Sequence, residues 1–129
     1  MEVVADASAL LAVALDEPER GSIIEATVGA TLISPLVLPY EIGNALVALR
    51  KKKRIEEKAI LPAWEVTQRI PVQLVPVQID AALALALAHG IYAYDAYYLH
   101  CSLSRRRPLV TLDGKMREVA DILGIQLLV

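Results

Sequence analysis

Residues 3–15, VVADASALLAVAL, decide the fold class. The run Val3–Ala5 has the length and composition of a short buried strand, and Ser8–Leu15 has those of an apolar helix. Asp6 stands at the junction between them and is the only charged residue of this stretch. A strand that leads directly into a helix is the first unit of an alternating α/β fold.

The rest of the chain repeats this alternation. Apolar runs bounded by turn residues predict further strands at Thr31–Ser34, Val72–Val77, Leu109–Leu112 and Ile125–Leu128. Apolar residues at helical spacing predict helices at Arg20–Val28, Leu36–Lys53, Ile55–Ile70, Ala81–His89, Tyr94–Ser104 and Lys115–Leu123. Pro62 is expected to kink or divide its helix, and Asp80 is expected to cap the helix that Gly90 closes. We therefore expect a single domain over residues 1–129, an α/β/α sandwich with a mostly parallel central sheet.

The composition predicts a partner and argues against two other kinds of binding. Apolar residues make up 56% of the chain, above the usual range of about 45–50%, so we expect apolar surface that a homodimer or another protein covers. The net charge of −2 excludes a simple basic surface for nucleic acid. The lone Cys101, the absence of a basic leader and the charges within both long apolar stretches predict a cytoplasmic protein outside the membrane.

Two further acidic residues stand alone in apolar surroundings. Glu41 is the only charge in residues 26–49, and Asp95 is the only charge in residues 81–104. A buried carboxylate without a partner costs several kcal/mol, so such residues are normally paired, hydrogen-bonded, protonated or bound to a metal. Structural interpretations stay open for each of them: Asp6 and Asp95 could cap helices, and Glu41 could form a salt bridge.

A fourth acid, Asp113, joins these three by topology. Asp6 and Asp113 each follow the C-terminal end of a predicted strand, and in a parallel sheet these ends meet at one edge. Glu41 and Asp95, near the starts of their helices, could point toward the same edge. Carboxylates brought together repel one another unless a cation neutralises them, and all-oxygen ligation suits Mg²⁺ or Mn²⁺. The dipeptide Asp113-Gly114 also fits an ordinary turn.

Four short motifs in order resemble those of the PIN-domain family, and specifically the compact VapC-type toxin ribonucleases, across nearly the whole chain. The motifs are Asp6-Ala7-Ser8-Ala9-Leu10, Glu41-Ile42-Gly43-Asn44-Ala45-Leu46, Tyr94-Asp95-Ala96-Tyr97-Tyr98-Leu99 and Leu109-Val110-Thr111-Leu112-Asp113. The resemblance implies a PIN-like fold and an endoribonuclease dependent on Mg²⁺ or Mn²⁺, with an RNA substrate and a cognate antitoxin. It implies an acidic quartet of Asp6, Glu41, Asp95 and Asp113, supported by Ser8, Asn44 and Thr111. Gly114 and Lys115 depart from the family's fourth motif, which leaves open whether Asp113 binds metal directly or through water.

Two basic runs and a group of tyrosines are candidates for contact with RNA. Arg50 and Lys51 begin one run, and Arg105 and Arg106 begin the other; either could contact phosphates or form a solvated helix end. Lys51–Lys53 lie roughly 15 Å from Glu41 at the usual helical rise. The tyrosines could stack on unpaired bases or pack in a core or interface; they are Tyr92, Tyr94, Tyr97 and Tyr98.

Two other functions compete with the nuclease. In a phosphoryl-transfer protein, such as an aspartyl-phosphatase or receiver-like domain, Asp6 would be the nucleophile and Lys115 a phosphate partner. Ser8 stands where such proteins have a second acid, which disfavours this hypothesis. In a non-catalytic interaction module, the fold would serve only to bind a partner, and nothing in a scaffold requires four isolated acids.

Overall fold

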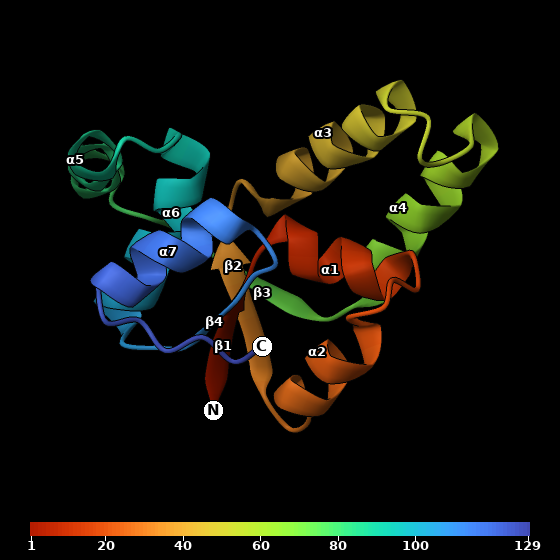
Figure 1. Ribbon diagram of the computed structural model, residues 1–129. Coiled ribbons are helices and arrows are strands. Elements are labelled where there is room, and N and C mark those ends of the chain that lie inside the picture. The colour runs from red at the N-terminus through yellow and green to blue at the C-terminus, as the bar shows by residue number, and fades with distance from the viewer.

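The computed structural model describes residues 1–129 and contains a four-stranded sheet in the order β3-β2-β1-β4, with all neighbouring strands parallel (Figure 1). The strands are β1 (Glu2–Ala5), β2 (Thr31–Pro35), β3 (Val72–Val75) and β4 (Leu109–Val110). The order places β1 and β2 at the centre. This arrangement brings the C-terminal ends of all four strands to one edge of the sheet.

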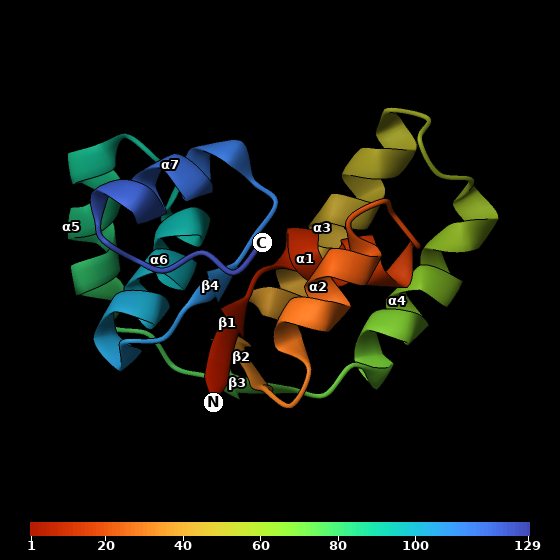
Figure 2. The same cartoon turned by 60° about the horizontal axis from the view of Figure 1, so that its bottom comes forward.

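Seven α-helices flank this sheet. They are α1 (Ala7–Ala14), α2 (Arg20–Thr27), α3 (Leu38–Lys51), α4 (Ile60–Arg69), α5 (Ile79–His89), α6 (Ala93–Arg105) and α7 (Gly114–Ile122), and the 3₁₀ turn η1 (Glu57–Ala59) precedes α4. Figures 1 and 2 show α5, α6 and α7 on one side of the strands and α1 to α4 on the other. The predicted α/β/α sandwich with a parallel sheet is therefore confirmed.

Both faces of the central strand β1 are covered. Its neighbours Val3 and Val4 point to opposite faces and are both fully buried. Val4 belongs to the main core with Leu99 of α6, whereas Val3 belongs to a smaller cluster with Ile23 of α2. A strand that is apolar on both faces is characteristic of parallel sheets between helical layers. The apolar run at residues 3–5 thus forms a central strand of the sheet, and this places Asp6 at the strand's C-terminal end.

Three predicted details are wrong. Pro62 does not divide a helix, because it is the third residue of α4, where the missing N–H group needs no partner within the helix. Asp80 does not cap α5, which begins at Ile79; its carboxylate instead accepts a hydrogen bond from the adjacent Ala81 N at 2.9 Å. The predicted last strand is reduced to a single bridge between Leu127 and Leu109.

The strand β4 is shorter than predicted because side chains replace its next backbone partners. The backbone N–H of Leu112 donates to Ser8 Oγ at 3.0 Å, and that of Asp113 donates to Thr111 Oγ1 at 3.1 Å. The chain therefore leaves the sheet directly after Val110 and turns into α7. This turn carries Thr111 and Asp113 to the edge where Asp6 lies.

None of the helices has the length and apolar character that crossing a membrane requires.

Candidate functional site

The four isolated acids meet beyond the C-terminal ends of the strands. Asp6 directly follows β1, Asp113 is the third residue after β4, and Glu41 and Asp95 lie in the first turns of α3 and α6. Their charges interact: Asp95, Asp6 and Asp113 all raise the pKa of Glu41, and Asp113 and Asp6 raise the pKa of Asp95. Residues from opposite ends of the chain therefore lie close enough for their charges to interact.

Asp6 is the most firmly held of the four. It is 3% exposed, and its Oδ1 accepts hydrogen bonds from Ser8 Oγ at 2.7 Å and from Ala9 N at 3.0 Å. Its Oδ2 accepts from Thr111 Oγ1 at 2.5 Å. Burial raises the pKa of Asp6, while these hydrogen bonds lower it and the charge of Asp113 raises it further. Asp6 thus caps α1 and also belongs to the acidic group, so its two interpretations are compatible.

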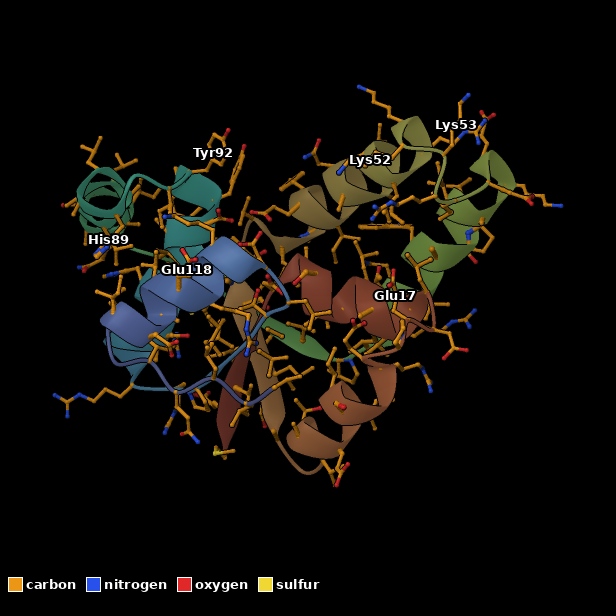
Figure 3. All side chains as sticks on the ribbon, in the orientation of Figure 1. Glu17, Lys52, Lys53, His89, Tyr92 and Glu118 are labelled. Atoms are coloured by element: carbon orange, nitrogen blue, oxygen red, sulfur yellow. The ribbon has the colours of Figure 1, made fainter.

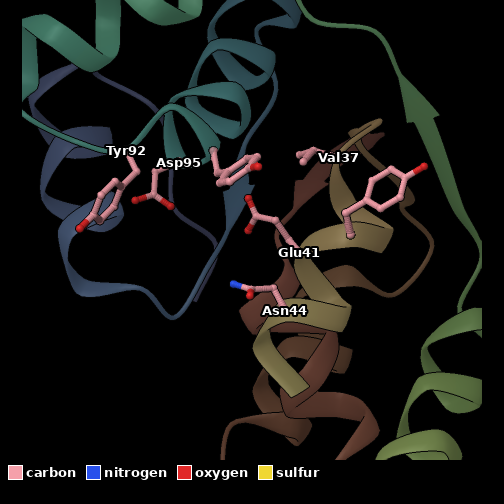
Figure 4. A pocket seen from close by; sticks show the side chains of 7 residues that line it. Val37, Glu41, Asn44, Tyr92 and Asp95 are labelled. Carbon is pink, nitrogen blue, oxygen red and sulfur yellow. The ribbon is translucent and has the colours of Figure 1, made fainter. Parts of the chain in front are cut away.

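Glu41 and Asp95 face each other across an open pocket of about 370 Å³. Figure 4 shows Glu41 and Asn44 projecting from α3 toward α6, which carries Asp95, with Tyr92 just before that helix. The residues that line the pocket are Val37, Tyr40, Glu41, Asn44, Tyr92, Tyr94 and Asp95. None of them is a lysine or arginine.

The structural interpretations of Glu41 and Asp95 are wrong. The chain forms four ion pairs, and neither residue takes part in any of them. The Oε1 atom of Glu41 is buried without a hydrogen-bond partner, and Tyr92, not Asp95, occupies the cap position of α6. Burial, the largest cause, and the neighbouring acids together raise the pKa of Glu41 to about 7 and that of Asp95 to about 6. No lysine or arginine side chain therefore neutralises either carboxylate.

Asp113 has a structural role, although not the turn that the Asp113-Gly114 dipeptide suggested, because Gly114 already begins α7. It is exposed and caps α7, because its Oδ1 accepts a hydrogen bond from Met116 N at 2.8 Å. Its charge nevertheless acts on Asp6, Glu41 and Asp95. Asp113 therefore lies at the rim of the acidic group.

The donor set fits a hard divalent cation. All the groups are oxygen donors, they repel one another, and the buried Oε1 of Glu41 has no partner. The side chains do not form a coordination site in this arrangement, because no group of three or more His, Cys, Asp or Glu residues is placed to hold an ion. A cation would therefore have to draw these carboxylates closer together as it binds.

The predicted site residues fall into two groups. Ser8 and Thr111 hydrogen-bond to Asp6, and Asn44 lines the pocket beside Glu41. The basic candidates lie elsewhere: Arg50 and Lys51 are at the C-terminal end of α3, and Figure 3 shows Lys53 just beyond them, far from Tyr92. Arg105 and Arg106 are at the end of α6 opposite to Asp95, near Pro108, which precedes β4. RNA contact by either basic run stays a prediction.

Tyr40 was not among the candidates predicted from the sequence. It stands between Pro39 and Glu41 in the chain, and it lines the pocket. Its signal is its spacing, because Tyr40 precedes Asn44 by four residues and such residues share one face of a helix. The tyrosines that were predicted as RNA contacts differ in exposure: Tyr92 and Tyr94 are exposed at the pocket, whereas Tyr98 is fully buried.

The acidic group makes the metal-free protein sensitive to pH in an unusual direction. The pKa of Glu41 rises from 4.5 to about 7 on folding, and that of Asp95 rises from 3.8 to about 6. Because the folded state disfavours ionisation, these groups support folding below their ordinary pKa values and lose this support as the pH rises through the folded values. We expect urea denaturation to show a falling free energy of unfolding between about pH 4 and about pH 8.

The control for this prediction is Glu41→Gln, which cannot ionise and should flatten the decline. An added divalent cation should restore stability mainly at the high-pH end, where the carboxylates are charged. If Glu41→Gln shows the same decline as the wild-type protein, Glu41 is not the group responsible.

Fold and site together define an α/β protein with an acidic pocket at the carboxyl edge of a parallel sheet. A model of the PIN domain matches residues 3–122. The chain therefore belongs to the PIN-domain family.

Individual relatives span nearly the whole chain. The chain is 29% identical over 123 residues to Ribonuclease VapC3 from Pyrobaculum aerophilum, covering 92% of this chain and 94% of the relative. The crystal structure of PAE2754 from Pyrobaculum aerophilum matches with a TM-score of 0.71 and 26% identity, covering 99% of this chain and 84% of that one. VapBC2 from Rickettsia felis, bound to a DNA fragment from their promoter, matches with a TM-score of 0.66 over 98% of this chain and 97% of that one; its 10% identity shows the fold alone.

Proposed function

We propose that the protein is an endoribonuclease dependent on Mg²⁺ or Mn²⁺ and the toxin of a toxin–antitoxin pair. The observation that carries this proposal is the meeting of four carboxylates from four separate elements, with no lysine or arginine to neutralise them. Membership of the PIN-domain family and the likeness to a ribonuclease of the VapC type support the same function.

Asp6, Glu41 and Asp95 are the residues that would hold the metal, with Asp113 at the rim contributing directly or through water. A divalent ion in such a site would lower the pKa of water and would stabilise the negative charge that develops on the phosphate oxygens. Ser8 and Thr111 fix the orientation of Asp6 through their hydroxyl groups. Asn44 offers an amide beside Glu41 that can hydrogen-bond to the substrate.

The geometry does not favour phosphoryl transfer through Asp6. Both oxygens of Asp6 accept hydrogen bonds and the residue is 3% exposed, so a phosphate has little access to it. Lys115, the phosphate partner in that hypothesis, is exposed and lies 3.8 Å from Glu118.

Incubation of the purified protein with total RNA tests the proposal. We expect cleavage products with Mg²⁺ or Mn²⁺ and none with a chelator, and sequencing of the new RNA ends would then locate the cut. A covalent acyl-phosphate instead of cleavage would favour phosphoryl transfer. Failure both to cleave RNA and to bind Mn²⁺ in calorimetry would favour an interaction module.

The apolar surface supports the proposed protein partners. On α5, Ile79, Leu83 and Leu87 are exposed at four-residue spacing and form an apolar stripe of the kind that another chain covers. We propose that a homodimer and a cognate antitoxin together cover such surfaces, and that the antitoxin places a basic side chain in the acidic pocket. Purification of the protein from its native operon should yield a second small protein, whose removal should release the nuclease activity.

A further inference from the structure

Three of the five tyrosines of this chain line the acidic pocket, and the other two lie beside them on α6. Tyr40, Tyr92 and Tyr94 line the pocket, and the ring of Tyr97 packs edge-on against that of Tyr94, with centroids 6.0 Å apart and planes at 78°. Tyr98 is buried close enough to Glu41, Asp6 and Asp95 for their charges to raise its pKa. The chain has five tyrosines and no phenylalanine, so the tyrosines at the pocket and beside it on α6 are all its aromatic residues except the single tryptophan.

The side chains of the tyrosines that line the pocket are largely exposed to solvent. Tyr40 is 80% exposed, Tyr92 is 83% exposed and Tyr94 is 56% exposed, whereas Tyr98 is fully buried. Burial of an aromatic side chain contributes strongly to stability, so exposed rings gathered at one pocket indicate a surface for a ligand. The rings also come from two elements, because Tyr40 belongs to α3 and the other two lie at the start of α6.

The charges of the pocket favour contact between these rings and a nucleobase over contact with a phosphate. Glu41 and Asp95 repel a phosphate, and the pocket offers no lysine or arginine to attract one. A nucleobase is flat and uncharged, and base stacking on an aromatic ring is worth about 1–3 kcal/mol. Asn44, exposed in the same pocket, carries an amide that can donate to and accept from a base edge.

We propose that Tyr40, Tyr92 and Tyr94 form a nucleobase subsite, which holds one unpaired base of the substrate by stacking beside the carboxylates. The subsite rests on the proposed ribonuclease function. It gives the enzyme affinity for RNA that no lysine or arginine of the pocket supplies. A base held in a duplex is already stacked and paired, so only an unpaired base can enter.

The first test compares cleavage kinetics of alanine and phenylalanine variants on a single-stranded RNA. Tyr92→Ala should raise KM about tenfold, the loss of about 1.4 kcal/mol of stacking, with kcat changed much less. Tyr92→Phe keeps the ring and should recover most of the lost affinity. Leu61→Ala removes an apolar side chain that is 70% exposed on α4, outside the pocket, and should match the wild-type protein. An unchanged KM in Tyr92→Ala and Tyr40→Ala would overturn the proposal.

The second test needs no cleavage and therefore separates the subsite from the proposed function. Adenosine 5′-monophosphate has no internucleotide bond, and ribose 5-phosphate is its counterpart without a base. In NMR titrations with Mg²⁺ present, the nucleotide should shift the ring signals of Tyr40, Tyr92 and Tyr94 more strongly than ribose 5-phosphate does, and Tyr92→Ala should remove this difference.

The combined outcomes are distinct. A wild-type protein that cleaves no RNA but binds the nucleotide through its base contradicts the nuclease and leaves the subsite standing. Cleavage of RNA by a protein whose tyrosine signals respond equally to both ligands, or to neither, overturns the subsite alone. Loss of a co-purified protein from the tyrosine variants, with RNA kinetics unchanged, would assign the rings to a protein partner and also overturn it.

Discussion

The Asp95→Asn variant is expected to cleave RNA more than about a hundredfold more slowly than the wild-type protein. Changing a residue that only supports a metal ligand already lowers activity by about 10–100-fold, and Asp95 is proposed to bind the metal itself. Asparagine keeps the size of the side chain and removes the charge. Asp95 accepts no hydrogen bond that holds the fold and its pKa is raised to about 6 by burial and neighbouring acids, so the metal-free protein should not lose stability. Cleavage assays with Mn²⁺ and thermal denaturation of the same preparation would measure both effects.

Asp80→Asn is the matched control, because Asp80 also lies in the first turn of a helix but is exposed on α5, away from the pocket. It should retain full activity. Asp6→Asn should likewise abolish cleavage, although some stability should be lost because Asp6 caps α1 and accepts three hydrogen bonds. Unchanged cleavage in a folded Asp95→Asn protein would remove that residue from the site.

The Thr111→Val variant is expected to lower activity by about 10–100-fold without touching any acidic residue. Thr111 is fully buried, donates to Asp6 Oδ2, and accepts a hydrogen bond from Asp113 N at 3.1 Å. Valine preserves the shape but leaves Oδ2 of Asp6 without its donor and the N–H group of Asp113 without its acceptor. The free energy of unfolding should fall by about 1–3 kcal/mol, since a buried group left unsatisfied costs about that much.

Thr67→Val separates the two effects. Thr67 is also buried, at 3% exposed, and its hydroxyl donates to Trp64 O at 2.6 Å within α4, outside the acidic group. This variant should change stability without changing the rate of cleavage per folded molecule. If Thr111→Val loses no more activity than Thr67→Val, the orientation of Asp6 does not depend on the threonine hydroxyl.

The meeting of the acids could be predicted because it follows from topology. Asp6 and Asp113 are 107 positions apart (113 − 6), yet each follows a parallel strand, and parallel strands end at a common edge. The apolar surroundings of Glu41 and Asp95 marked them as residues with an unusual environment. Tertiary structure was needed to show that neither is neutralised, because a salt bridge partner can come from any part of the chain.

The details that the sequence did not predict depend on competition between local and tertiary interactions. Pro62 falls in the first turn of α4 because the chain between Lys52 and Glu56 is not helical, which moves the start of the helix toward the proline. Tyr97 and Tyr98 are adjacent in the third motif, yet only Tyr98 is fully buried, since neighbouring positions on a helix face different sides. The side that meets the core is set by packing against the sheet.

Anomalous diffraction from a crystal soaked in Mn²⁺ tests the shared acidic centre most directly. The proposed function predicts a manganese peak bounded by carboxylate oxygens of Asp6, Glu41 and Asp95, with Asp113 bound directly or through water. A peak only at other residues, or none at an Mn²⁺ concentration that supports cleavage, would contradict it.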